Sequence, residues 1–124
     1  MEKNEKSYLK EIIGSMVGQI SLSAPASHQM SWGIEKVYAQ YYPHHGHPSP
    51  TLVMKVNGFN YKGIVRVVYN EGTDLYDILT NGDVIEDVYC DVLGNVLDKL
   101  IEKGDMSEEE YRKRVEQTYK VIEI

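Results

Sequence analysis

Several residue types are scarce in this chain of 124 residues, which has one cysteine, one phenylalanine and one tryptophan. Because Cys90 stands alone, no disulfide can form within the chain, and this favours a reducing compartment. No apolar run approaches the ~18 residues that a membrane-spanning helix needs. The sequence therefore predicts a cytoplasmic protein, in which Cys90 is a small packing residue beside a helical stripe rather than a catalytic thiol.

Motifs for the common catalytic classes are also missing. The chain has no phosphate-binding glycine loop, no nucleophile elbow, no dinucleotide fingerprint and no aromatic RNA-binding motif in a basic field. Its net charge of −6 disfavours non-specific binding to nucleic acid, because phosphates attract basic surfaces. On this basis the sequence assigns no catalytic residue, no cofactor or cofactor-binding residue, and no metal ligand.

Tyrosine and acidic residues are abundant. The chain has ten tyrosines, which suit half-buried strands and binding surfaces alike. Residues 1–70 hold seven Lys/Arg and four Asp/Glu, whereas residues 71–124 hold six Lys/Arg and fifteen Asp/Glu. The negative charge is thus concentrated in the second half, which favours a protein partner more basic than this chain.

Three segments have the apolar spacing of amphipathic helices. The first spans about residues 4–20, and the second runs from about Val88 to Lys103 with Gly104 as its stop. A third begins at Ser107, because Ser107 and Glu110 form a capping box. The stripe of the second helix consists of Tyr89, Val92, Leu93, Val96, Leu97, Leu100 and Ile101.

Between the first two helices the sequence predicts about five antiparallel strands. The first runs from Trp32 to about Tyr42, and turn signals then divide Thr51–Asp87 into four more. Asn-Gly at 57–58 and at 81–82 predicts two-residue hairpins, since this pair supplies positive φ values. A third turn is predicted around Gly72 in the left-handed conformation.

These turns predict a register for the sheet. Val56 would lie opposite Phe59, Val67 opposite Leu75, and Leu79 opposite Val84. The resulting apolar face consists of Leu52, Met54, Val56, Phe59, Tyr61, Val65, Val67, Leu75, Leu79 and Val84. The expected architecture is one α+β domain over residues 1–124, with an N-terminal helix, the antiparallel meander, and two C-terminal helices packed on one face of the sheet.

The segment "YYPHHGHPSP", residues 41–50, concentrates His44, His45 and His47. Histidine is a common zinc ligand, and a His-X-X-His spacing separates His44 from His47. The prolines and glycine indicate a loop, so a further ligand would have to come from elsewhere, for example His28 or an aspartate. The favoured interpretation is a metal-free, exposed, proline-stiffened connection between two strands.

Asp77 and Glu86 form a second candidate constellation. The predicted hairpin places them opposite each other on the otherwise apolar face. Two close carboxylates could serve as acid and base, but like charges facing each other across buried strands are destabilising. The favoured interpretation is that the strand ends are exposed or that the register contains a bulge.

The function that best fits these observations is a small acidic protein-binding module, an adaptor, regulator or inhibitor without catalytic activity. Its contact surfaces would be the strand Trp32–Tyr42 with the loop after it, and the acidic helices. Homo-oligomerisation stays open. The alternative is a metal-binding protein or metal-dependent enzyme that uses His44, His45 and His47.

Overall fold

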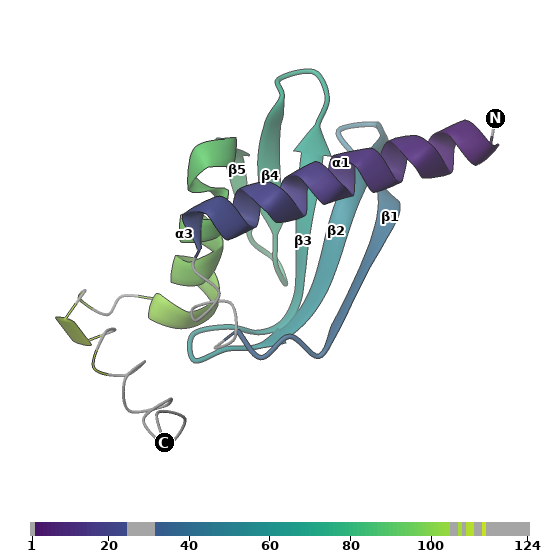
Figure 1. Cartoon of the computed structure of the whole chain (residues 1–124). Helices are drawn as coiled ribbons and strands as arrows, with labels where there is room; N and C mark the ends of the chain where they lie inside the picture. Colours follow the sequence, from purple (N-terminus) through teal and green to yellow (C-terminus); the bar gives the residue numbers. More distant parts are fainter. Residues whose placement is uncertain (1, 25–31, 105–106, 108, 111–112, 114–124) are drawn as a thin grey trace, which may run out of the picture.

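The structure is a computed structural model that describes residues 2–24, 32–104, 107, 109–110 and 113. A long helix precedes five strands and a short C-terminal helical segment (Figure 1). These elements are α1 (Glu2–Ser23), β1 (Lys36–His44), β2 (His47–Asn57), β3 (Lys62–Asn70), β4 (Leu75–Leu79), β5 (Val84–Val88), a 3₁₀ turn (Cys90–Val92), α3 (Leu93–Asp98) and a π-helical turn (Lys99–Lys103).

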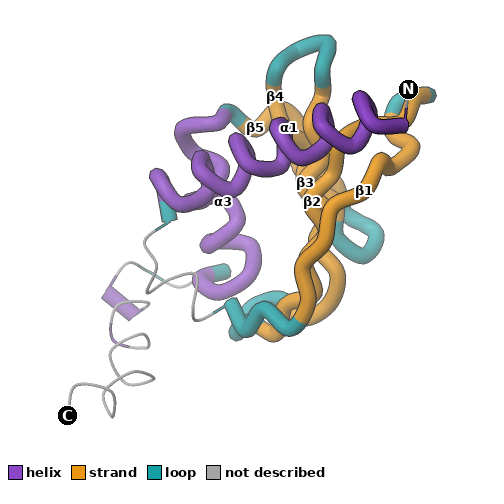
Figure 2. The backbone as a smooth tube through the Cα atoms, turned by 45° about the vertical axis from the view of Figure 1, so that its right-hand side comes forward, coloured by secondary structure: helices purple, strands orange, loops and turns teal. Residues whose placement is uncertain are grey.

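The five strands form one antiparallel sheet in the order β1-β2-β3-β4-β5. Helix α1 crosses one face of this sheet, and α3 lies beside it on the same side (Figures 1 and 2). The predicted α+β class, with an antiparallel meander, is confirmed. Within the described residues, no helix has the length and apolar character needed to cross a membrane.

One apolar core fills the space between the sheet and the helices, on what is called here the helix face. Helix α1 contributes Met16 and Ile20 to it, and the C-terminal segment contributes Leu93, Leu97 and Ile101. The predicted burial of Leu93 and Leu97 is confirmed, since both side chains are fully buried. Sheet residues of this core include Leu52, Met54, Val56, Val65, Val67, Tyr76 and Ile78.

Trp32 belongs to this core and not to a surface strand. Its side chain is 1% exposed, and its indole Nε1–H donates a 2.8 Å hydrogen bond to Asp98 Oδ1. A large apolar ring with one polar atom is stable in a core when that atom finds a partner. The prediction that Trp32 begins a strand and forms part of a contact surface is therefore wrong, because β1 begins at Lys36.

The turn at residues 57–58 is longer than predicted. Val56 lies opposite Gly63, and a four-residue loop joins Asn57 to Lys62. The backbone N–H groups of Asn60 and Tyr61 both donate to Ile101 O, at 2.9 and 3.0 Å, so the loop binds the end of the C-terminal segment. The predicted pairing with Phe59 is wrong by four residues, an even shift that leaves the faces of β2 and β3 unchanged.

The β3–β4 pairing differs from the prediction by three residues. Val67 lies opposite Ile78, not Leu75, and the left-handed residue of the turn is Asp74, with φ 57°, not Gly72. An odd shift exchanges the two faces of a strand. Tyr76 and Ile78 therefore enter the helix-face core, while Leu75, Asp77 and Leu79 face the other side.

The 81–82 turn agrees with the prediction in its pairing. Leu79 lies opposite Val84, and Thr80 N–H donates to Asp83 O at 2.9 Å. Gly82 supplies a positive φ of 95°. The predicted inward position of Val84 is wrong, because this side chain is 53% exposed.

The C-terminal segment begins later than predicted, at Cys90, and ends as predicted at Gly104, whose φ is 54°. Cys90 is exposed, so its prediction as a packing residue is wrong. Most of the second C-terminal helix, predicted from Ser107, lies outside the described residues and is not confirmed. Ser107 Oγ does accept a 3.1 Å hydrogen bond from Glu110 N–H, as a capping box requires.

Candidate metal centre

The histidine-rich segment forms the turn of a β-hairpin. His44 lies opposite His47, and the two residues between them, His45 and Gly46, have φ values of 51° and 84°. Two consecutive positive φ values characterise the type I′ turn that joins strands through two residues. The prediction of a loop is therefore wrong, because β1 and β2 continue into this segment. The predicted exposure is confirmed for residues 45–48 but is wrong for Ser49 and Pro50, which are buried.

The prolines are compatible with these strands. In a two-residue hairpin the residues flanking the turn form a hydrogen-bonded pair, so the next pair, Pro43 with Pro48, exchanges no bond. The pairing of β2 with β3 starts only at Thr51, beyond both Pro48 and Pro50. Proline therefore removes no ladder bond at any of these positions.

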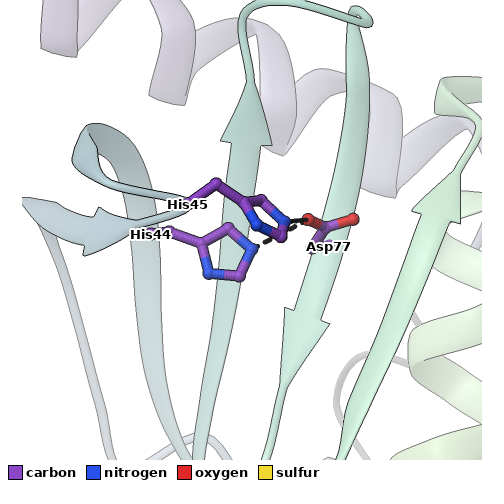
Figure 3. Close-up of side chains that lie close together, drawn as sticks. All are labelled: His44, His45 and Asp77. Carbon is purple, nitrogen blue, oxygen red and sulfur yellow. Dashed lines mark hydrogen bonds and ion pairs between the residues drawn. The ribbon is translucent and has the colours of Figure 1, made fainter.

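The turn conformation brings two consecutive histidines to the same side. Neighbouring residues of a regular strand point to opposite faces, but His45 is in the left-handed conformation. The rings of His44 and His45 have centroids 4.0 Å apart, and both reach toward β4 (Figure 3). His47 is exposed, and its Nδ1 lies 3.1 Å from the carbonyl oxygen of Pro48.

Asp77, from β4, is the residue that the two histidines contact. Its Oδ2 lies 2.8 Å from His44 Nε2 and 3.4 Å from His45 Nε2. The carboxyl is almost fully buried, and its Oδ1 accepts a 3.0 Å hydrogen bond from the backbone N–H of Asp87. Burial alone would raise the pKa of Asp77, but hydrogen bonds from Asp87 and His44, with a smaller contribution from His45, hold the pKa below its ordinary value.

A β-bulge positions the donor on β5. Ile78 pairs with Ile85 and Tyr76 with Val88, so two residues of β5 lie opposite Asp77. One of them, Asp87, has a φ of 58°. The bulged register that the sequence favoured is confirmed. The side chain of Glu86 is exposed, as expected, but the side chain of Asp77 is buried, so the expected exposure of Asp77 is wrong. Asp77 faces the two histidines instead.

This cluster lies on the sheet face away from α1, called here the polar face. Thr51, Val53 and Val68 are fully buried on it. Beside them the Arg66 guanidinium lies over the Tyr42 ring, with its Cζ 4.8 Å from the ring centroid. The polar face thus has a buried centre of its own, made of polar and β-branched side chains.

The geometry of the three side chains fits a metal ion. One ligand atom from each of His44, His45 and Asp77 lies within 4.8 Å of the other two. Imidazole nitrogen and carboxylate oxygen both bind zinc at about 2.0–2.2 Å. The His45 side chain is 55% exposed, so the cluster is open to solvent on one side.

The sequence contained part of this site. Pro43-His44-His45-Gly46-His47-Pro48 is symmetric about a His-Gly pair, and histidine is one of the residues that tolerate positive φ. That symmetry was a signal for a two-residue hairpin. Nothing local linked it to Asp77, which lies 33 positions further along the chain. His28, the other suggested ligand, lies outside the described residues.

Comparisons of the chain with protein-family models, with curated proteins and with solved structures give no match in any of the three. Function is therefore inferred from the chemistry of His44, His45 and Asp77.

Proposed function

We propose that the protein binds a divalent transition-metal ion, zinc in the simplest case, through His44, His45 and Asp77. The observation that supports this proposal is the convergence of two imidazole nitrogens on one buried carboxylate. Asp77 takes the place that the sequence-based alternative gave to His47. Three protein ligands with an open fourth position are typical of zinc sites that bind an exchangeable water or substrate.

The ligand types favour transition metals over magnesium and calcium. Mg²⁺ and Ca²⁺ prefer sites made entirely of oxygen, whereas imidazole suits zinc, copper, nickel and iron. Two histidines with one carboxylate also suit ferrous iron. A metal ion bound here would replace the direct hydrogen bond between His44 and Asp77. Metal binding requires the imidazoles to be neutral and the carboxylate to be ionised. The lowered pKa of Asp77 keeps its carboxylate ionised.

A supporting hydrogen bond orients the carboxylate. Asp87 N–H binds Oδ1 of Asp77, and this leaves Oδ2 directed at the two histidines. Such partners behind a metal ligand fix its orientation and commonly change metal affinity ten- to a hundred-fold. The bulge at Asp87 therefore serves the site as well as the sheet.

Calorimetric titration of zinc into tag-free, chelator-treated protein tests the proposal. We expect one ion per chain, and at least ten-fold weaker binding in His44→Gln, His45→Gln and Asp77→Asn. His47→Gln is the matched control, because it removes an exposed histidine of the same hairpin and should leave affinity unchanged. Equal loss in His47→Gln, or unchanged binding in Asp77→Asn, would indicate scavenging by an exposed histidine cluster and would contradict the proposal.

Protein binding is the second candidate, and the observation that favours it is the exposed edge strand β1. Val37 and Tyr38 are 57% and 42% exposed, and among the described strands β1 pairs with β2 alone. An unpaired edge offers backbone N–H and C=O groups to an added strand from a partner. A partner more basic than this chain would match the acidic second half.

Ala39→Pro tests this candidate. The alternation of the β1–β2 ladder directs the N–H of Ala39 outward, so proline removes an edge donor without breaking the hairpin. A partner captured by the wild type and by Asp77→Asn should be lost in Ala39→Pro. Retention of that partner by Ala39→Pro would reject strand addition at β1.

A further inference from the structure

A pocket of about 370 Å³ lies between the start of β3 and the β4–β5 turn. Its lining includes Lys62, Ile64 and Arg66 from β3, and Thr80, Asn81 and Gly82 from the turn. This volume lies within the range of small-molecule sites. The pocket is separate from the cluster of His44, His45 and Asp77, since none of these three residues lines it.

We propose that this pocket binds the carboxylate or phosphate group of a small molecule, with Arg66 as its principal donor. The proposal does not depend on the metal site. It rests on the buried Nε of Arg66 that has no acceptor, on the positive charge of the lining, and on the position of the pocket in the sheet.

Arg66 has one buried donor without an acceptor. Its Nε is buried and makes no hydrogen bond within the described part of the chain. The contact of the guanidinium with the Tyr42 ring, 4.8 Å from Cζ to the ring centroid, holds the group in place but supplies no oxygen acceptor for its N–H donors. A buried donor without a partner costs free energy, and an oxyanion that accepts two parallel N–H bonds removes that cost.

The lining of the pocket is positive in an otherwise acidic chain. Lys62 and Arg66 both contribute to it, and none of the described lining residues is acidic. Tyr61 at the same pocket already uses its hydroxyl, which donates to Ile64 O at 2.8 Å and accepts from Asn81 N–H at 3.2 Å. These bonds link the β4–β5 turn to the start of β3 across the pocket.

The pocket is a neighbour of the metal cluster. Arg66 pairs with Leu79 and Val68 pairs with Asp77, two positions further along the same strands. Two residues of a strand span about 7 Å. A small acid held by Arg66 therefore lies on the same face as His44, His45 and Asp77.

A titration followed by ¹H–¹⁵N NMR, with inorganic phosphate in one arm and malonate in the other at constant ionic strength, tests the proposal. We expect saturable shifts of the Arg66 Nε–H and of the backbone amides of Asn81 and Gly82 with at least one of the two anions. The arm that saturates at lower concentration identifies the preferred acid group. Arg66→Gln should weaken binding at least ten-fold.

Matched variants separate a built site from general charge attraction. Lys10→Gln removes the same charge from an exposed position of α1 and should leave affinity unchanged. Lys62→Gln, at an exposed position of the pocket, should weaken binding a few-fold and serves if Arg66→Gln fails to fold. Shifts with neither anion, or equal losses in Lys10→Gln and Lys62→Gln, would overturn the proposal.

Discussion

The two faces of the sheet are both buried at their centres, yet they are built from different side chains. On the helix face, Leu52, Val65 and Ile78 pack against α1 and the C-terminal segment. On the polar face, no helix of the described residues covers Thr51 and Asp77, but both are almost completely buried. Histidines from the β1–β2 turn reach across the strands to Asp77 (Figure 3).

The difference separates two roles. Apolar packing is non-directional, so the helix face tolerates exchanges between apolar side chains of similar volume. Buried polar groups need specific partners, and each group without a partner is costly. The polar face therefore restricts which side chains it accepts, and its restrictions centre on the cluster of His44, His45 and Asp77 and on Arg66.

The largest expected effect is on the helix face. Leu97 is fully buried in the core, so Leu97→Ala should lower the free energy of unfolding by about 2–5 kcal/mol in denaturant melts. Leu22→Ala is the matched control, since Leu22 is 88% exposed and should change stability by less than about 0.5 kcal/mol. A loss below about 1 kcal/mol in Leu97→Ala would mean that this face is not the main core.

A smaller effect is expected on the polar face in metal-free protein. Asp77→Asn removes the charge that binds His44 and should cost about 1.5–3 kcal/mol, the range for hydrogen bonds to charged groups. Asp83→Asn, in the exposed β4–β5 turn, is the control and should be close to neutral. If Asp77→Asn were more stable than the wild type, the buried contact would cost stability, and the polar face would be held by its apolar members.

Two glycines, one at a close contact between α1 and α3 and one at an open position of α1, test how tightly the helices pack. A Cβ at Gly94 would lie 2.4 Å from Ile20 O, so Gly94→Ala should destabilise by about 1–3 kcal/mol through overpacking of α3 on α1. A Cβ at Gly14 would meet nothing within 4 Å, so Gly14→Ala should stabilise α1 by up to about 1 kcal/mol. Thermal melts of both variants check this, and a neutral Gly94→Ala would mean that the two helices are not in close contact.

The smallest expected effect is the dependence of the free energy of unfolding on pH. Because the pKa of Asp77 in the folded protein lies below its ordinary value of 3.8, its contribution to stability is complete above that value and is lost as the pH falls below it. The loss is at most about 1.4 kcal/mol per pH unit for one proton. The stability difference between wild type and Asp77→Asn, followed from pH 5 to pH 2.5 without metal, should therefore shrink. A constant difference would contradict an ionised Asp77 held by these contacts.

The fold was largely predictable because its elements depend on local signals. Helical spacing in residues 4–20 and the Asn-Gly pair at 81–82 each depend on a few neighbouring residues, and the structure has α1 and the β4–β5 turn there. The errors came where distant segments decide the geometry. The 58–61 loop is longer than a two-residue turn, and its Asn60 and Tyr61 N–H groups bind Ile101 O, at least 40 residues away.

The site was predictable only in part for the same reason. His44 and His45 stood out by composition, whereas the role of Asp77 depended on the β3–β4 register. An error of three residues there placed Asp77 on the apolar face and hid its proximity to the histidines. His47 resembled the other two in sequence and pairs with His44 across the hairpin, but its ring contacts the Pro48 carbonyl oxygen and does not join the cluster of His44, His45 and Asp77.

The most direct test of the metal proposal is an anomalous difference map at the zinc edge, from a crystal grown with one equivalent of zinc. The proposal predicts one strong peak about 2.0–2.2 Å from His44 Nε2, His45 Nε2 and a carboxylate oxygen of Asp77. Peaks found only at His47 or at surface carboxylates, with His44 still in direct contact with Asp77, would contradict it.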